Sequence, residues 1–379
     1  MMEPLFRANA LAQPMTQISL LDRRSADAAL PRAGKSRVPD DKAMLRAAVE
    51  LTRDLNAANP RIYWADMLGS AALGYVGLAT AILAASPGIA VVAAIVASLA
   101  LYRAGSFIHE LTHIHRDALP GFRLGWNAVV GVPLLIPSFL YEGVHTLHHA
   151  RTRYGTVEDP EYLPLALMKP WTLPLFLVVS TLAPIALLFR FAGLTPLSLV
   201  WPTLRTVVVE RFSGLQINPE FRRRPAEGDL RRNWAWQEGA ASLWAISLLA
   251  MVFTGVIPLR AFLIFLGVAS GTMLLNQVRT LVAHLWENDG EAMSVTAQYL
   301  DSVNVPPPST LPALWAPVGL RYHALHHLMP SLPYHSLGEA HRRLAGVLDV
   351  ESPFYAANHR GLPMLVKRLA VSSWRGGAA

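Results

Sequence analysis

Apolar residues gather along the chain into four long runs, each close to the length that crosses a membrane. A hydrocarbon core of roughly 30 Å needs about 20 helical residues. The first two runs are separated only by a turn at Pro87, and the last two only by a turn at Pro258. Such short connections join antiparallel neighbours. The pattern predicts two transmembrane helical hairpins, with spans at 64–86, 88–108, 239–257 and 261–284.

The arginines outside these hairpins set the expected orientation. Residues 22–61 are polar and basic, with a helix expected to begin near Asp40 or Asp41, and the long middle segment carries arginines at 222–224 and 231–232. Both hairpin turns are nearly uncharged. Because cytoplasmic loops are enriched in Lys and Arg, both termini and the middle segment are predicted to face the cytoplasm.

Two further apolar stretches are interrupted by prolines. Residues 124–141 and 171–194 each contain two. A single crossing by 171–194 would place the chain after it on the opposite side of the membrane from the chain before it. We therefore expect interfacial or re-entrant helices, with six or more full spans as the alternative.

Composition agrees with a membrane protein, because 53% of the residues are hydrophobic and only 16% are charged. Residues 1–24 lack the continuous apolar core of a secretory signal, so membrane entry is expected from the internal spans. The pI of about 9.8 is explained by the topology. Nucleic-acid binding does not suit so apolar a chain.

Cysteine and histidine usage narrows the chemistry. The chain has no cysteine, which excludes disulfides, thiolate zinc sites and iron–sulfur clusters held by this chain. It has 13 histidines, and eight of them fall in three tight clusters. Any metal is therefore held by nitrogen or oxygen.

The first cluster is His109-Glu-Leu-Thr-His113, at the end of the second span. Histidines at i and i+4 share one helical face and can meet one metal or two adjacent ones. Taken alone, this is also the H-E-x-x-H of zinc proteases, with Glu110 as general base.

The other two clusters are both H-x-x-H-H, beginning at His145 and at His323. By chance, two such clusters are expected on the order of once in 10⁴ chains of this composition. Residues i and i+3 share a helical face while the adjacent histidine points about 100° away, which suits neighbouring metals. A catalytic zinc takes three protein ligands, so eight imidazoles favour two metals. Imidazole suits iron, copper, zinc and nickel alike.

The order H-x-x-x-H, H-x-x-H-H, H-x-x-H-H, with a hairpin between the second and third boxes, resembles the membrane fatty acid desaturase family. That family includes related hydroxylases and carotenoid oxygenases. The similarity covers roughly residues 62–345. The third box continues as Leu328-Met329-Pro330, which looks like the desaturase pattern H-H-L-F-P with Met for Phe. This tail favours desaturation over hydroxylation.

The resemblance implies an all-α integral membrane protein with about four spans in two hairpins, interfacial helices and a cytosolic cap that holds a di-iron site. It divides the chain into a cytoplasmic segment 1–61, a desaturase-like domain 62–345 and a cytoplasmic tail 346–379. It also implies a ninth ligand from the last span, and Thr280 stands where the acyl-CoA branch has an asparagine. The implied iron ligands are His109, His113, His145, His148, His149, His284, His323, His326 and His327.

The implied activity uses dioxygen, a lipid acyl chain and a separate electron donor of the ferredoxin, rubredoxin or cytochrome b5 type. The first hypothesis for the function is desaturation of the acyl chain, and the alternative is a fatty acyl, alkyl or carotenoid hydroxylase or ketolase. An intramembrane zinc protease is a remote third alternative. Docking of an acidic donor is compatible with the basic cytoplasmic surface.

Four further residues near the boxes are candidates for orienting the ligands by hydrogen bonds to their outer nitrogens. The competing interpretation is ordinary helix-face or capping polarity, and for Asp159 a turn. His115, by contrast, is expected to point off the ligand face. The four candidates are Glu110, Glu142, Asp159 and His335.

Overall fold

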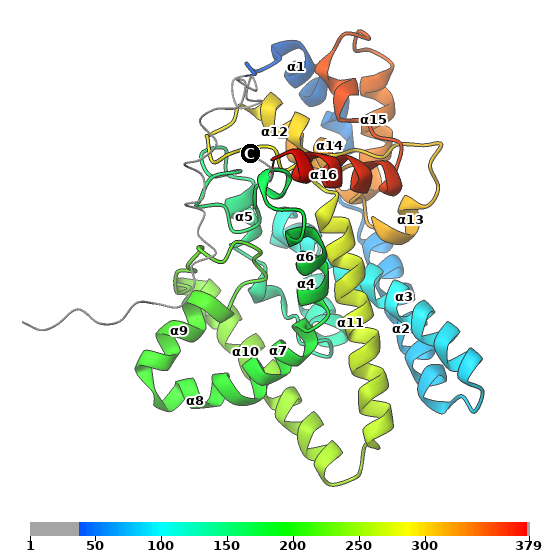
Figure 1. The fold of residues 1–379 in the computed structure, drawn as a ribbon, viewed down its shortest axis with the longest axis vertical. Coiled ribbons are helices and arrows are strands. Elements are labelled where there is room, and N and C mark those ends of the chain that lie inside the picture. The colour runs from blue at the N-terminus through cyan, green and yellow to red at the C-terminus, as the bar shows by residue number, and fades with distance from the viewer. Residues whose placement is uncertain (1–37, 377–379) are drawn as a thin grey trace, which may run out of the picture.

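The computed structural model describes residues 38–376, whose regular secondary structure is helical, with isolated β-bridges and no β-strand among the described residues (Figure 1). Most of the predicted segment 1–61 thus lies outside the described residues. The helices discussed below are α1 (Lys42–Thr52), α2 (Pro60–Leu83), α3 (Pro87–His113), α4 (Phe122–Trp126), α5 (His145–His148), α6 (Thr172–Ser180), α7 (Ala183–Phe189), α8 (Thr195–Val200), α9 (Pro202–Phe212), α10 (Gly228–Phe253), α11 (Leu259–Leu281), α12 (Val295–Asp301), α14 (His323–Leu328), α15 (Leu337–Ala345) and α16 (Leu362–Gly376).

The first hairpin consists of α2 and α3, which pack closely along their length. Asn59 caps α2 by accepting from the Arg61 N–H, and Pro60 stands at the first helical position, where a missing N–H costs nothing. Gly77 lets the two backbones approach, because a Cβ there would lie 3.1 Å from the Ala93 carbonyl oxygen. The predicted first hairpin is confirmed.

The second hairpin, α10 and α11, opens like a V from its turn at Pro258 (Figure 1). Helices α6 and α7 pack against α11, and α10 packs against the π-helical turn Arg190–Leu194 that follows α7. Inside this half Glu238 is buried and paired with Arg190 and Arg205, at 2.6 and 2.8 Å. The buried charge of Glu238 is therefore compensated within the protein, as membrane interiors require.

By length and hydropathy, the candidate spans among the described residues are Pro60–Leu83, Pro87–His113, Ala183–Val200 and Leu259–Leu281. Three of them match predicted spans. The third differs, because the predicted span 239–257 lies in α10, which is not among them, while Ala183–Val200 joins α7, a π-helical turn and α8.

The path of the chain after α8 shows how these two segments relate. Helix α9 has 11 residues, roughly 16 Å of helix, which is too short to recross a membrane. Yet the chain that follows is back at the histidines: the Ile217 N–H donates to the Pro160 carbonyl (3.0 Å), and Arg223 donates to the Glu142 carbonyl (2.6 Å). The chain from Ala183 to the end of α9 therefore leads away from the histidines and back to them, and α10 carries it to the far turn at Pro258. Such a path is the one expected of a re-entrant segment, which stays a prediction.

The other proline-interrupted stretch, 124–141, holds no helix long enough to cross. It contains the end of the five-residue α4, the π-helical turn Asn127–Gly131 and the 3-10 turn Ser138–Leu140. This segment packs beneath the histidines, since Trp126 donates its indole N–H to the Ala104 carbonyl of α3 at 2.8 Å.

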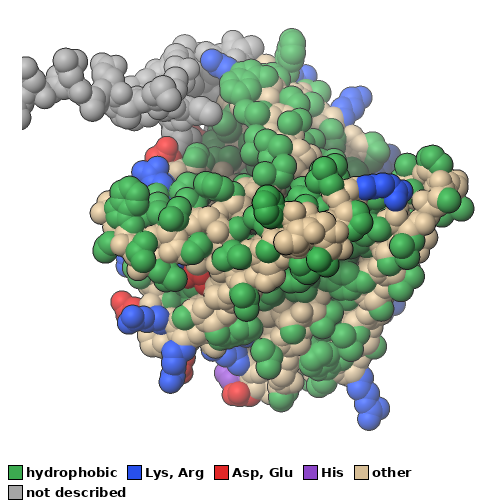
Figure 2. Space-filling view, turned by 90° about the horizontal axis from the view of Figure 1, so that it is seen from below, with side chains coloured by type: hydrophobic (Ala, Val, Ile, Leu, Met, Phe, Trp, Pro, Cys, Tyr) green, Lys and Arg blue, Asp and Glu red, His purple; other side chains and the backbone are tan. Residues whose placement is uncertain are grey.

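The outer faces of the hairpins are apolar. Leu73, Val76, Val91 and Val92 of α2 and α3 are more than half exposed, which suits a lipid environment. Viewed from the hairpin-turn end, hydrophobic side chains spread over the molecule and charged ones stand at its edges (Figure 2).

At the opposite end, α1, α12, α14 and α15 form a cap around their own core, which includes Met44, Tyr299, Leu325 and Leu344. Helix α1 begins where predicted, because the Asp41 carboxylate accepts from the N–H groups of Ala43 and Met44. Within the predicted tail 346–379, α16 buries Leu365 and Leu369.

This arrangement yields a topology prediction. We expect single cysteines at positions 225 and 350, and also at 30 in the undescribed segment, to react with a membrane-impermeant maleimide only after the cytoplasmic side is opened. Cysteines at 87 and 259, in turns that lie together at the end remote from the histidines (Figure 1), are expected to react in intact cells. The chain has no cysteine of its own, so the background is clean. Labelling of 225 from outside alone would contradict the four-span arrangement.

Candidate metal centre

Four segments bring nine histidines together at the junction of the spans and the cap. The end of α3, the short α5, the turn after α11 and α14 each contribute. The ligand nitrogens form two groups, and within each group they lie within 4.8 Å of one another. The first group is His109, His113, His145, His149 and His326; the second is His148, His284, His323 and His327.

The spacing of the nitrogens suits a shared cation. In the first group, the Nε2 atom of His326 lies 3.1 Å from that of His113 and 3.2 Å from that of His149. In the second group, His323 Nε2 lies 3.1 Å from His284 Nε2. Two nitrogens that each bind one ion at about 2.1 Å lie about 3.0 to 3.4 Å apart at octahedral or tetrahedral angles.

Unsatisfied nitrogens point the same way. His109 is 5% exposed, and neither of its ring nitrogens has a hydrogen-bond partner in the described structure. The nearest carboxylate oxygen, on Glu110, lies 3.5 Å from its Nδ1, which is long for a hydrogen bond. Orphaned buried nitrogens are rare in folded proteins, and a metal in the first group would satisfy this one.

Burial keeps most of these rings in the neutral form that binds metal. Desolvation, helped by neighbouring rings, lowers the pKa of several imidazoles well below the ordinary value; among those outside the spans are His145, His149, His323, His326 and His327. His148 is the exception: burial acts to lower its pKa, but the adjoining Asp159 carboxylate raises it overall.

Carboxylates orient two histidines of the second box. His148 donates its Nδ1–H to Asp159, whose oxygens lie 2.9 and 3.0 Å away, and Asp159 is fully buried. His145 donates its Nδ1–H to Glu161 at 2.8 Å, and the Tyr141 hydroxyl donates to the same carboxylate. Burial raises the pKa of Glu161 to about 7. Such partners fix the ring orientation and leave Nε2 for the metal.

His284 follows α11 and reaches the second group from a turn. Its Nδ1 lies 2.8 Å from the Tyr154 hydroxyl and 3.1 Å from Ser302 Oγ. The Tyr154 hydroxyl in turn donates to Asp301 at 3.0 Å. A buried tyrosine and carboxylate thus hold the outer nitrogen of His284, as Asp159 holds that of His148.

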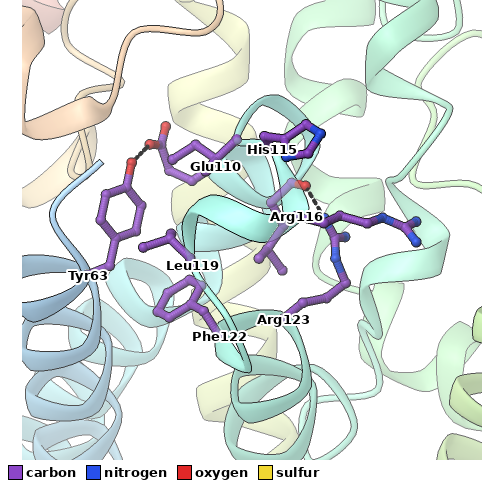
Figure 3. A pocket seen from close by; sticks show the side chains of 9 residues that line it. Tyr63, Glu110, His115, Arg116, Leu119, Phe122 and Arg123 are labelled. Atoms are coloured by element: carbon purple, nitrogen blue, oxygen red, sulfur yellow. Dashed lines mark hydrogen bonds between the residues drawn. The ribbon is translucent and has the colours of Figure 1, made fainter. Parts of the chain in front are cut away.

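The remaining predicted neighbours have other contacts. Glu142 binds Ser138, Arg116 and Arg123, and His335 accepts from the Asn59 N–H at 3.1 Å. Glu110 accepts from the Tyr63 hydroxyl and from the Tyr334 N–H, beside the small pocket that Leu119 and Phe122 help to line (Figure 3). These contacts hold α2, α4 and the cap around α3.

Sequence reasoning missed several groups around the rings. Glu161, Tyr154, Asp301 and Arg279 were not singled out, although Glu161 stands two residues after Asp159. That proximity was a usable signal. The others come from distant segments, 147 residues apart in the Tyr154–Asp301 bond, and carry no local pattern.

Comparison with known proteins places this site in a family. The fatty acid desaturase family model matches residues 85–358. The chain is also 49% identical, over 327 residues, to a ceramide hydroxylase of Caulobacter vibrioides (strain NA1000 / CB15N), an alignment that covers 86% of this chain and 93% of the relative. The family match includes all three histidine boxes, and the alignment with the relative covers most of the chain. The protein belongs to the fatty acid desaturase family.

Proposed function

We propose that this protein is a membrane di-iron oxygenase that hydroxylates a ceramide-type lipid. The likeness to a ceramide hydroxylase over 86% of the chain carries the choice of reaction. The groups of five and four imidazoles, seven of them buried, support two irons, which when bound would supply the activation of dioxygen. The family match and the use of both H-x-x-H-H boxes leave the zinc-protease alternative without support.

This proposal replaces the sequence-based preference for desaturation. That preference rested on the tail of the third box, and the structure shows what the tail does. Leu328 and Met329 pack against the cap core, and Met329 Sδ accepts from the Thr52 hydroxyl of α1 at 3.3 Å. The tail therefore helps to hold the cap, and the choice of reaction rests on the relative.

The chain's own residues do the positioning. Asp159 and Glu161 hold the rings of His148 and His145, and Tyr154 supports His284. Hydroxylation inserts one atom of dioxygen into a C–H bond and reduces the other atom to water. The reaction consumes two electrons and two protons. Because the chain has no cysteine for an iron–sulfur cluster, we propose that a separate donor protein supplies the electrons.

The product's mass tests this function. We expect a ceramide-producing host that expresses the protein to accumulate ceramide with one added oxygen, carrying the heavy isotope when grown under isotopically labelled dioxygen. Lipids are measured by mass spectrometry, with the His326→Ala variant as the inactive control. Loss of two hydrogens without added oxygen would return the assignment to desaturation.

A further inference from the structure

Arg279 is a buried cation beside the second group of histidines. It lies in the last turn of α11 and is 8% exposed. Its Nη2 is 2.8 Å from His323 Nδ1, and its Nε–H has no hydrogen-bond partner in the described structure. A desolvated guanidinium with a free donor is costly unless something else satisfies it.

The contact with His323 does not solve this problem once the ring serves as a ligand. A neutral imidazole that gives its Nε2 lone pair to a metal carries its hydrogen on Nδ1. Arginine has only donors, so an N–H would then face an N–H. The guanidinium consequently needs a different acceptor in the loaded protein.

The oxygen-bearing side chains that act most strongly on the Arg279 charge have hydrogen-bond partners of their own, and none of them accepts from the Arg279 Nε–H. They are Tyr102, Tyr141 and Glu161. Tyr102 donates to the Trp315 carbonyl at 2.9 Å, and Tyr141 donates to Glu161, which also accepts from His145. The Arg279 Nε–H is therefore a buried donor without a partner in the described structure, beside His323 of the second histidine group.

We propose that Arg279 binds the amide carbonyl oxygen of the lipid substrate. This inference rests on the proposed function and deepens it. The middle of a hydrocarbon chain offers no hydrogen-bond acceptor. A buried arginine that faced it would lose its hydration and gain no hydrogen bond in exchange. The oxidised carbon therefore lies next to the oxygen-bearing part of the lipid and not midway along its tail.

Binding to purified protein tests the contact apart from turnover. The probes are N-palmitoyl-dihydrosphingosine and its uncharged analogue in which a trans alkene replaces the amide, with the hydroxyls masked in both. We expect the wild type to bind the amide roughly ten- to a hundred-fold more tightly, the range of a hydrogen bond to a charged group. In Arg279→Gln that ratio is expected to fall to about one, and Arg279→Lys to retain part of it.

Arg260→Gln is the matched control, because Arg260 lies on the same helix at the far turn and donates to the Ile82 carbonyl. Metal content of each variant is measured in parallel. An unchanged ratio in Arg279→Gln, or lost metal with the ratio preserved, would make Arg279 a support for His323 and overturn the proposal.

Fragmentation of the wild-type product supplies a test that needs no variant. A new hydroxyl on a carbon next to the amide or to a hydroxyl-bearing carbon supports the assignment, and a hydroxyl in mid-chain overturns it. If the wild type shows the binding ratio but oxidises no ceramide, the proposed function fails while the recognition by Arg279 stands.

Discussion

Replacing His326 or His284 by alanine is expected to remove one metal ion each and to abolish turnover. His326 joins the rings of His113 and His149 in the first group, whereas His284 is one of only four rings in the second. Each substitution leaves an incomplete donor set around a site that must bind its ion firmly. We expect two irons per wild-type chain and about one in each variant, measured by elemental analysis of purified protein.

The control for both variants is His115→Ala, which removes a histidine two residues beyond the first box whose side chain is 80% exposed. It is expected to keep its metal and its activity. A wild-type preparation with a single zinc, and full turnover in both histidine variants, would contradict the di-iron assignment. Full metal in His284→Ala alone would remove that residue from the ligand set.

Asp159→Asn is expected to weaken metal binding, with the largest effect after those of the two histidine variants. In addition to His148, the Asp159 carboxylate accepts from the N–H groups of Gly155 and Glu161, both at 2.8 Å. An asparagine of the same shape places an NH₂ group against one of these donors. Loss of such an outer partner typically lowers metal affinity roughly 10- to 100-fold.

Chelator titration, followed by the spectrum of the bound metal, measures this effect. In Asp159→Asn we expect the chelator to remove the ion of the second histidine group while the first group keeps its ion. Glu158→Gln is the matched control, because Glu158 adjoins Asp159 in sequence and its side chain is 64% exposed. Equal affinities for Asp159→Asn and wild type would refute the role of Asp159.

Much of the architecture could be predicted because its causes are local. The length of an apolar run decides whether it can cross a membrane, and Pro87 and Pro258 mark where such runs end. The first hairpin, the far turn and the start of α1 at Asp41 all follow from a few neighbouring residues. The three histidine boxes are equally local, because their spacing sets which rings share a helical face.

The third crossing was predicted at 239–257, but the length and hydropathy of the helices select a different segment. Apolar composition favours Ala183–Val200, while α10 carries Glu238, a residue that hydropathy counts against a span. Only the fold shows that Arg190 and Arg205 neutralise this carboxylate and that the chain after α9 returns to Pro160. Long-range pairing changes what a membrane will accept, and a hydropathy window does not detect it.

The sequence by itself determined the donor chemistry: abundant imidazole, no thiolate and box spacings suited to two metals. The tertiary structure alone decided how the rings divide, with His148 in one group and its neighbour His149 in the other. It also decided which groups contact the outer nitrogens of the rings. Tyr154, which donates to Asp301, contacts His284, and Arg279 contacts His323. The physical reason is that an outer hydrogen bond depends on two distant segments meeting within about 3 Å, a distance that only the packing of the spans against the cap sets.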